Sequence, residues 1–256
     1  MSKRKKFILT SIVTSLGFLG IQLLPESFRI LSIAALGLLT TLLFIWSLWE
    51  GLGLNLTLLT LVLPFYFTVG VGLFWFLLPV SIITRVPILV LFGFGIYALC
   101  LTANIYTVAA IRTIALMRAA RGVGFVLTLL TFFLIFDTLL SLHWPVYYSS
   151  FLVMLTSFPL YYQGYWSIVI NKTFTKDVFL VSAVSSLMIG EIAASLFFWP
   201  VTVVVGSLFL TLTAYVLLGL GQAKIEGRLF SQTIKEYLIL GFFVFIGMFI
   251  ATSWSR

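Results

Sequence analysis

The chain has 256 residues, of which 62% are hydrophobic and only 9% are charged, and its formal net charge is +8 at pH 7. Soluble domains carry roughly 25% charged residues, and a water-soluble protein this apolar would expose large hydrophobic patches. These values exclude an ordinary soluble domain and predict an all-α fold, a polytopic integral membrane bundle of helices. The positive charges lie at the ends of apolar runs, which favours anionic lipid headgroups over nucleic acid as their partner.

The apolar runs divide into about nine spans, because each transmembrane helix needs ~20 apolar residues. The connectors between them are short, so we expect a single transmembrane domain over residues 1–256 and no soluble domain. The basic start and apolar core of the chain are typical of a signal peptide, but a second span follows at once, which predicts a retained first helix. The expected spans cover residues 7–24, 29–49, 56–80, 86–111, 123–142, 148–170, 178–198, 202–221 and 237–253.

The apolar stretch from 178 to 221 is too long for one span. As a single helix it would measure about 66 Å at 1.5 Å per residue, whereas the hydrocarbon core is ~30 Å thick. Proline interrupts the helical hydrogen bonds and tryptophan prefers the membrane interface. The sequence therefore predicts a turn at Trp199-Pro200 and an antiparallel helix hairpin.

Two acids, Asp137 and Glu191, lie well inside apolar runs. A charged carboxylate in the bilayer is disfavoured by roughly 3 kcal/mol or more, and acids within spans are often proton or cation sites. We expect both side chains to point into the bundle, with Arg85 and His143 as possible partners at the outer ends of their spans. The alternative is a structural role, in which each acid forms a hydrogen bond between helices.

A second polar patch combines residues of two spans. Asn104 and Tyr106 lie in the fourth span, and Tyr162 and Gln163 lie in the sixth, which also contains Pro159. A helix loosened by proline with a glutamine facing inward is suited to line a ligand cleft. The alternative is an aromatic belt at the membrane interface combined with hydrogen bonds between helices.

A stripe of small residues recurs every four positions in the seventh span: Ser182, Ser186, Gly190 and Ala194. Small residues at this spacing let a second helix backbone approach closely. The stripe predicts a packing face, either inside the chain or toward a membrane-protein partner or a second copy in a homo-oligomer. Glu191 lies about 100° from Gly190 around the helix, so it is expected to face the interior.

Arg118 and Arg121 are three residues apart between the fourth and fifth spans, where they predict a short interfacial helix that binds lipid phosphate. The chain contains no HExxH motif, no Walker loop and no Gly-x-Ser-x-Gly elbow. Its one cysteine, Cys100, lies inside a span. These patterns indicate no metal site, no cofactor and no catalytic residue.

Three functional hypotheses follow from these features. The leading one is a small transporter or permease-like protein with Asp137 and Glu191 as proton or cation sites. The first alternative is a non-catalytic membrane subunit or scaffold of a larger complex. The second alternative is a membrane enzyme acting on a lipid or an isoprenoid, although the sequence shows no recognisable catalytic set.

Loop charges predict the orientation, since cytoplasmic loops attract lysine and arginine. With nine spans and a cytoplasmic N-terminus, twelve basic residues fall inside and three fall outside, which suggests a plasma or inner membrane protein. The inside set is Lys3, Arg4, Lys5, Lys6, Arg112, Arg118, Arg121, Lys172, Lys176, Lys224, Arg228 and Lys235. The outside set is Arg29, Arg85 and Arg256.

Reporter fusions test this topology. A reporter after Arg121 is expected to lie in the cytoplasm and one after Arg256 outside it, because five of the predicted spans, an odd number, lie between the two positions. Alkaline phosphatase and a fluorescent protein at each position measure the compartment. If both positions report the same side, the nine-span topology is wrong.

Overall fold

The computed structural model of the chain describes residues 2–21, 24–49, 54–78, 82–109, 116–170 and 175–252. Within these ranges all regular structure is helical, with nine α-helices and no strand. Six of these helices are long and apolar enough to cross a membrane. The predicted all-α membrane bundle is therefore confirmed.

The described helices alternate with short connections. They are α1 (Lys3–Ile21), α2 (Glu26–Leu48), α3 (Leu54–Trp75), α4 (Ile82–Ala109), α5 (Met117–Ser141), α6 (Val146–Val169), α7 (Lys176–Leu196), α8 (Val203–Ile225) and α9 (Ser231–Ala251). The chain forms two compact units, residues 1–131 and 132–256, so that α5 contributes to both. The single transmembrane domain expected from the sequence stays a prediction.

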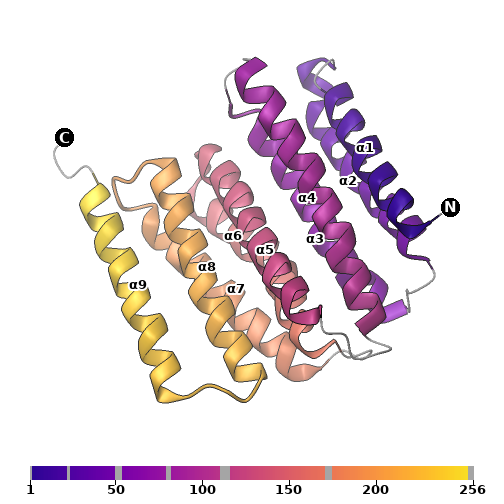
Figure 1. Cartoon of the computed structure of the whole chain (residues 1–256). Helices are drawn as coiled ribbons and strands as arrows, with labels where there is room; N and C mark the ends of the chain where they lie inside the picture. Colours follow the sequence, from indigo (N-terminus) through magenta and orange to yellow (C-terminus); the bar gives the residue numbers. More distant parts are fainter. Residues whose placement is uncertain are drawn as a thin grey trace. The chain divides into compact units, whose positions relative to one another are not determined.

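In the first unit, α1 packs against α2 and α4, and α3 also packs against α2 and α4; Figure 1 shows these four helices together. Its core is aromatic: the Phe18 ring lies 5.2 Å from that of Trp75 and 5.1 Å from that of Phe92, and Phe92 stacks on Phe67 at 5.9 Å. Gly95 of α4 makes room for this cluster, since a Cβ there would lie 2.5 Å from the Phe67 ring. A glycine facing an aromatic ring brings α3 and α4 close together.

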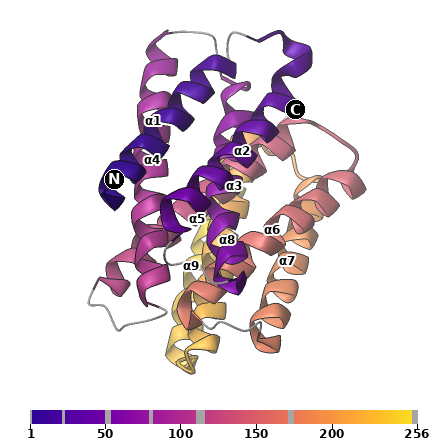
Figure 2. The same cartoon turned by 90° about the vertical axis from the view of Figure 1, so that its right-hand side faces the viewer.

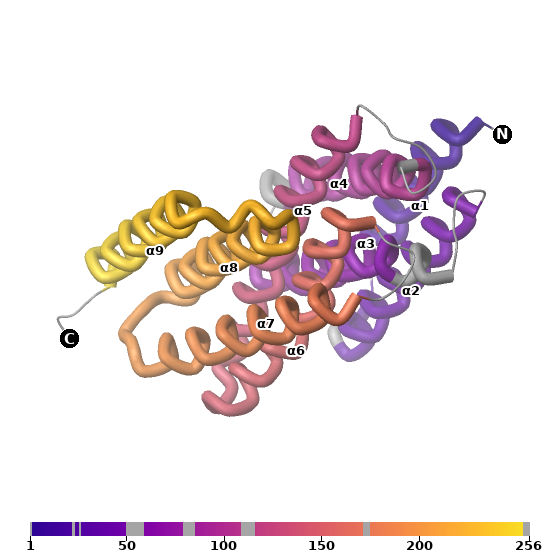
Figure 3. Tube along the Cα trace, turned by 90° about the horizontal axis from the view of Figure 1, so that it is seen from below, coloured from indigo at the N-terminus to yellow at the C-terminus, as the bar shows by residue number. Residues whose placement is uncertain are grey.

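In the second unit, α6 and α7 are the most extensively packed pair, and they run side by side in Figure 2. Helix α8 packs against both of them, and α9 packs against α8, as Figure 3 shows. Along α9 most large apolar side chains are exposed, and Met248 is its buried side chain within the described range. This outward apolar surface suits a helix that faces lipid.

The predicted hairpin is confirmed. Helix α7 ends at Leu196 and α8 begins at Val203, so the helix is interrupted at Trp199-Pro200. The two helices pack against each other, and the Trp199 ring lies 5.7 Å from the ring of Phe245 in α9. The proline breaks the ladder of hydrogen bonds, and the tryptophan secures the turn against a neighbouring helix.

The separate interfacial helix predicted around Arg118 and Arg121 is wrong for the residues that the structure describes. Both arginines belong to the first turns of α5, which runs without a break from Met117. Alanine and leucine around them favour helix, so the span extends back over the basic residues. Residues 110–115, with Arg112, lie outside the described part of the chain.

Replacement of Gly95 tests the aromatic core. Gly95→Ala is expected to lower the free energy of unfolding by about 1–3 kcal/mol, because the new methyl group meets the buried Phe67 ring. Thermal unfolding in detergent measures the effect. The control is Gly20→Ala, where nothing lies within 4 Å of an added Cβ. Equal midpoints for the two variants would contradict the close approach of α3 and α4.

Candidate functional site

Asp137 lies in the interior of the second unit. It is 5% exposed and sits four residues before the end of α5. The hydroxyl of Ser207 in α8 donates a hydrogen bond of 3.0 Å to Asp137 Oδ1. The prediction that this acid points into the bundle is therefore confirmed for its own unit.

The first turns of α8 bring Ser207 to the acid. The Thr202 hydroxyl caps α8 by accepting from the Val205 N–H at 3.4 Å, which sets where the helix begins. Gly206 has no side chain, so Leu140 of α5 approaches to 3.3 Å from the position of its missing Cβ. Leu140 and Gly206 thus lie side by side next to the pair formed by the serine hydroxyl and the carboxylate.

Glu191 is placed differently from the prediction. Its side chain is exposed, and none of the hydrogen bonds or ion pairs between described residues involves its carboxylate. The buried face of α7 includes Ser182, Ser185 and Ile189. Nine residues separate Ser182 from Glu191, which is about 900° of rotation at 100° per residue and puts them on opposite faces. The prediction that Glu191 faces inward is wrong. Gly190 lies at the edge of the buried face and not at its centre, so the next residue along the helix is exposed.

The two proposed partners of the acids have other neighbours. His143 is exposed in the α5–α6 connection, where its backbone is left-handed (φ 49°) and its Nδ1 donates to the Ser141 carbonyl at 2.7 Å. The Arg85 guanidinium lies 5.9 Å from the Trp75 ring in the first unit. In the described structure His143 therefore binds its own helix end rather than Asp137, and the pairing of Arg85 with an acid stays a prediction.

The polar patch predicted in α6 is deeply buried. Residues 160–167 are all buried, which is unlike an aromatic belt that faces the membrane interface. Gln163 is 4% exposed and its Oε1 has no hydrogen-bond partner in the described part of the chain. Tyr162, in contrast, has its ring 6.0 Å from that of Phe158 and 6.5 Å from that of Phe179, and serves as packing.

The other half of that patch lies in the first unit. The Tyr106 hydroxyl donates to the Ala120 carbonyl at 3.2 Å, and Asn104 is half-buried. Because Asn104 and Tyr106 belong to one unit and Tyr162 and Gln163 to the other, the combined cleft stays a prediction.

The predicted patch also spans Tyr161 and Tyr165, which the sequence did not single out as site residues. Tyr161 is fully buried, and its hydroxyl has no partner among the described residues. Tyr165 joins three helices: its hydroxyl lies 2.7 Å from the Ser185 hydroxyl of α7 and donates to the Leu217 carbonyl of α8 at 2.9 Å. The four-residue spacing of Ser157, Tyr161 and Tyr165 was the available signal, because such residues share a helix face.

The small-residue stripe packs inside the chain. Ser182, Ser186 and Gly190 are buried and Ala194 is half-buried. A Cβ on Gly190 would lie 3.0 Å from Met154 Cβ of α6, so this glycine brings α6 and α7 together. The intrachain alternative accounts for the stripe, and its use in an oligomer stays a prediction.

The helical fold, the apolar outer surface and the buried acid define a multi-pass helical membrane protein. Residues 10–251 match the family model DUF5656, described as a protein of unknown function, and the chain belongs to this family. No curated protein and no solved structure matches the chain.

Loss of the Tyr165 hydroxyl tests the junction of α6, α7 and α8. Tyr165→Phe is expected to lower the free energy of unfolding by about 0.6–2 kcal/mol, the range for hydrogen bonds between membrane helices. Thermal unfolding in detergent measures it, with Tyr148→Phe as the control because Tyr148 is exposed. Equal stability of the two variants would show that the junction contributes nothing.

Proposed function

We propose that the chain is a small transporter or permease-like membrane protein in which Asp137 binds the transported proton or cation. The observation that carries this proposal is a buried carboxylate whose hydrogen bond in the described structure comes from the neutral hydroxyl of Ser207. A basic partner would keep the carboxylate in its charged, deprotonated form. A neutral partner leaves it free to exchange a proton or to bind a cation.

Further polar groups of the second unit support a route past Asp137. The acid lies near one end of α5, whereas Ser157, Tyr161 and Tyr165 follow one face of α6 away from its start. The Tyr161 hydroxyl and Gln163 Oε1 are buried without a partner in the described structure. Buried polar atoms are stabilised by hydrogen bonds, so these two suit a passing ion, a water molecule or a polar substrate.

The proposal includes an orientation. A cytoplasmic N-terminus and an external C-terminus would put Asp137 in the outer half of the membrane, as the loop charges predict. A plasma or inner membrane location would supply the ion gradient that such a transporter needs.

A second candidate is a non-catalytic subunit of a membrane complex, and Glu191 favours it. An exposed carboxylate in a spanning helix is disfavoured by roughly 3 kcal/mol or more if it faces lipid in its charged form. A neighbouring protein with a lysine or arginine at this depth would remove that penalty. In this case α7 would be an interface, and Asp137 would be a structural hydrogen-bonding residue.

Proteoliposomes distinguish the two candidates. Purified chain in vesicles with an imposed ion gradient is expected to conduct protons or sodium ions, and Asp137→Asn is expected to reduce the flux to that of empty vesicles. An internal pH dye and radioactive sodium measure the two fluxes. The control Glu191→Gln should leave the flux unchanged, because that residue lies on the outer face of α7.

Two other outcomes have clear meanings. Wild-type flux equal to that of empty vesicles for both ions argues against the transporter. If, in addition, the chain migrates from native membranes in a larger assembly that Glu191→Lys dissociates and Glu191→Gln does not, the subunit function is favoured.

A further inference from the structure

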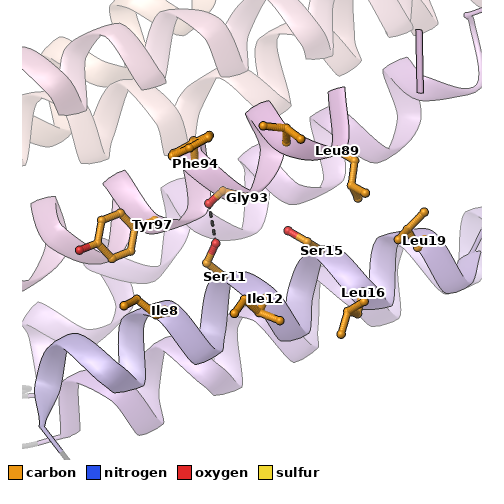
Figure 4. Close-up of a pocket in the computed structure, with 11 residues that line it drawn as sticks. Ile8, Ser11, Ile12, Ser15, Leu16, Leu19, Leu89, Gly93, Phe94 and Tyr97 are labelled. Carbon is orange, nitrogen blue, oxygen red and sulfur yellow. Dashed lines mark hydrogen bonds between the residues drawn. The ribbon is translucent and has the colours of Figure 1, made fainter. Parts of the chain in front are cut away.

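A groove of about 540 Å³ lies between α1 and α4, within the first unit (Figure 4). Its walls are apolar side chains, among them Ile12, Leu16 and Leu19 from α1 and Leu89 and Phe94 from α4. Several of these are exposed, including Phe94 at 68%. An open apolar groove in a membrane protein suits an apolar occupant such as the acyl chain of a lipid.

Two serine hydroxyls lie inside the groove. Ser11 Oγ donates to the Gly93 carbonyl at 2.6 Å, as the dashed line in Figure 4 shows. Ser15 points toward α4, and its Oγ is buried with no hydrogen-bond partner in the described part of the chain. The groove depends on Gly93, since a Cβ there would lie 2.9 Å from Ser15 Oγ.

The groove has the length of one membrane leaflet. From Ile8 to Leu19, α1 rises about 17 Å at 1.5 Å per residue, and half of the ~30 Å hydrocarbon core is about 15 Å. A lipid chain that starts at the N-terminal end of α1 would therefore extend along the whole groove. This match favours a lipid over a short soluble ligand.

Two cations extend the groove face beyond its N-terminal end. Arg4 and Lys5 precede Ile8 and Ile12 by four and seven residues, so they share the face of α1 that lines the groove. Both side chains are exposed, and neither takes part in an ion pair in the described structure. Lys6, in contrast, lies 5.5 Å from the Trp46 ring on another face of α1. Tyr97 lies beside Ile8 at the same end of the groove (Figure 4).

We propose that this groove binds one anionic phospholipid. The acyl chain lies between α1 and α4, and the phosphate lies between Arg4 and Lys5 at the N-terminal end of the groove. Basic side chains next to an apolar surface attract anionic lipid over zwitterionic lipid. The site is separate from Asp137 and requires no transport activity.

Native mass spectrometry tests the proposal on the full chain. The protein is reconstituted with equal parts of phosphatidylglycerol and phosphatidylcholine, then extracted in mild detergent. Wild type is expected to keep one phosphatidylglycerol. Ser15→Leu, which fills the groove, is expected to reduce occupancy by about tenfold, equivalent to roughly 1.4 kcal/mol. Ile12→Trp fills the groove from an exposed position and gives the same result if Ser15→Leu fails to fold.

The headgroup is tested separately. The double variant Arg4→Gln/Lys5→Gln is expected to lower the preference for phosphatidylglycerol roughly thirtyfold, the effect of two basic residues near anionic lipid, while one lipid of either kind stays bound. Matched controls are Ser32→Leu on an exposed part of α2 and Lys235→Gln in α9. Inorganic phosphate is expected not to displace the lipid, because it has no chain to fill the groove.

Three results would overturn the proposal. The first is lipid retention unaffected by both groove-filling variants. The second is a phosphatidylglycerol preference that depends on Arg118 and Arg121 and not on Arg4 and Lys5. The third is a second copy of the chain in place of lipid, seen as a dimer mass that Ile12→Trp converts to monomer.

Discussion

The packing of α6, α7 and α8 in the second unit depends on the two hydrogen bonds of the Tyr165 hydroxyl. It binds the Ser185 hydroxyl and the Leu217 carbonyl at once, and its ring packs over Gly221, where any side chain would clash. A lipid environment gives helices little hydrophobic reason to associate, so close packing and hydrogen bonds must hold them. One tyrosine supplies both for α6, α7 and α8.

The same constraint explains why unpartnered polar atoms are informative in this protein. Most serine and threonine hydroxyls in the described part of the chain donate to a carbonyl three or four residues earlier in their own helix, as Thr40, Thr128 and Ser182 do. These bonds satisfy a hydroxyl without any neighbour. Ser15, Tyr161 and Gln163 each keep a buried oxygen without such a bond in the described structure. A buried polar atom without a partner is costly, so these positions stand out from the other polar side chains.

The two intramembrane acids show how differently the fold treats similar residues. Asp137 is enclosed and hydrogen-bonded to Ser207, whereas Glu191 faces outward. Both interrupt apolar runs, and nothing in their local sequence separates them. The difference comes from the rotation of α7, whose buried face includes Ser185 and Ile189 and lies opposite the glutamate. A buried acid suits ion binding by this chain, and an outward acid suits contact with another molecule.

The sequence by itself determined the class of protein, the helical segments and the turn at Trp199-Pro200, because bilayer thickness and proline chemistry act on local sequence. It also singled out Asp137 and Gln163 as buried polar residues, since polar side chains in apolar runs are rare. Only the tertiary structure decided which face of each helix is buried. It placed Glu191 on the exposed face of α7, contrary to the prediction, and it showed how Tyr161 and Tyr165 are buried. It also revealed the groove between α1 and α4, because Ser15 and Gly93 come together only when two helices far apart in the sequence are packed against each other.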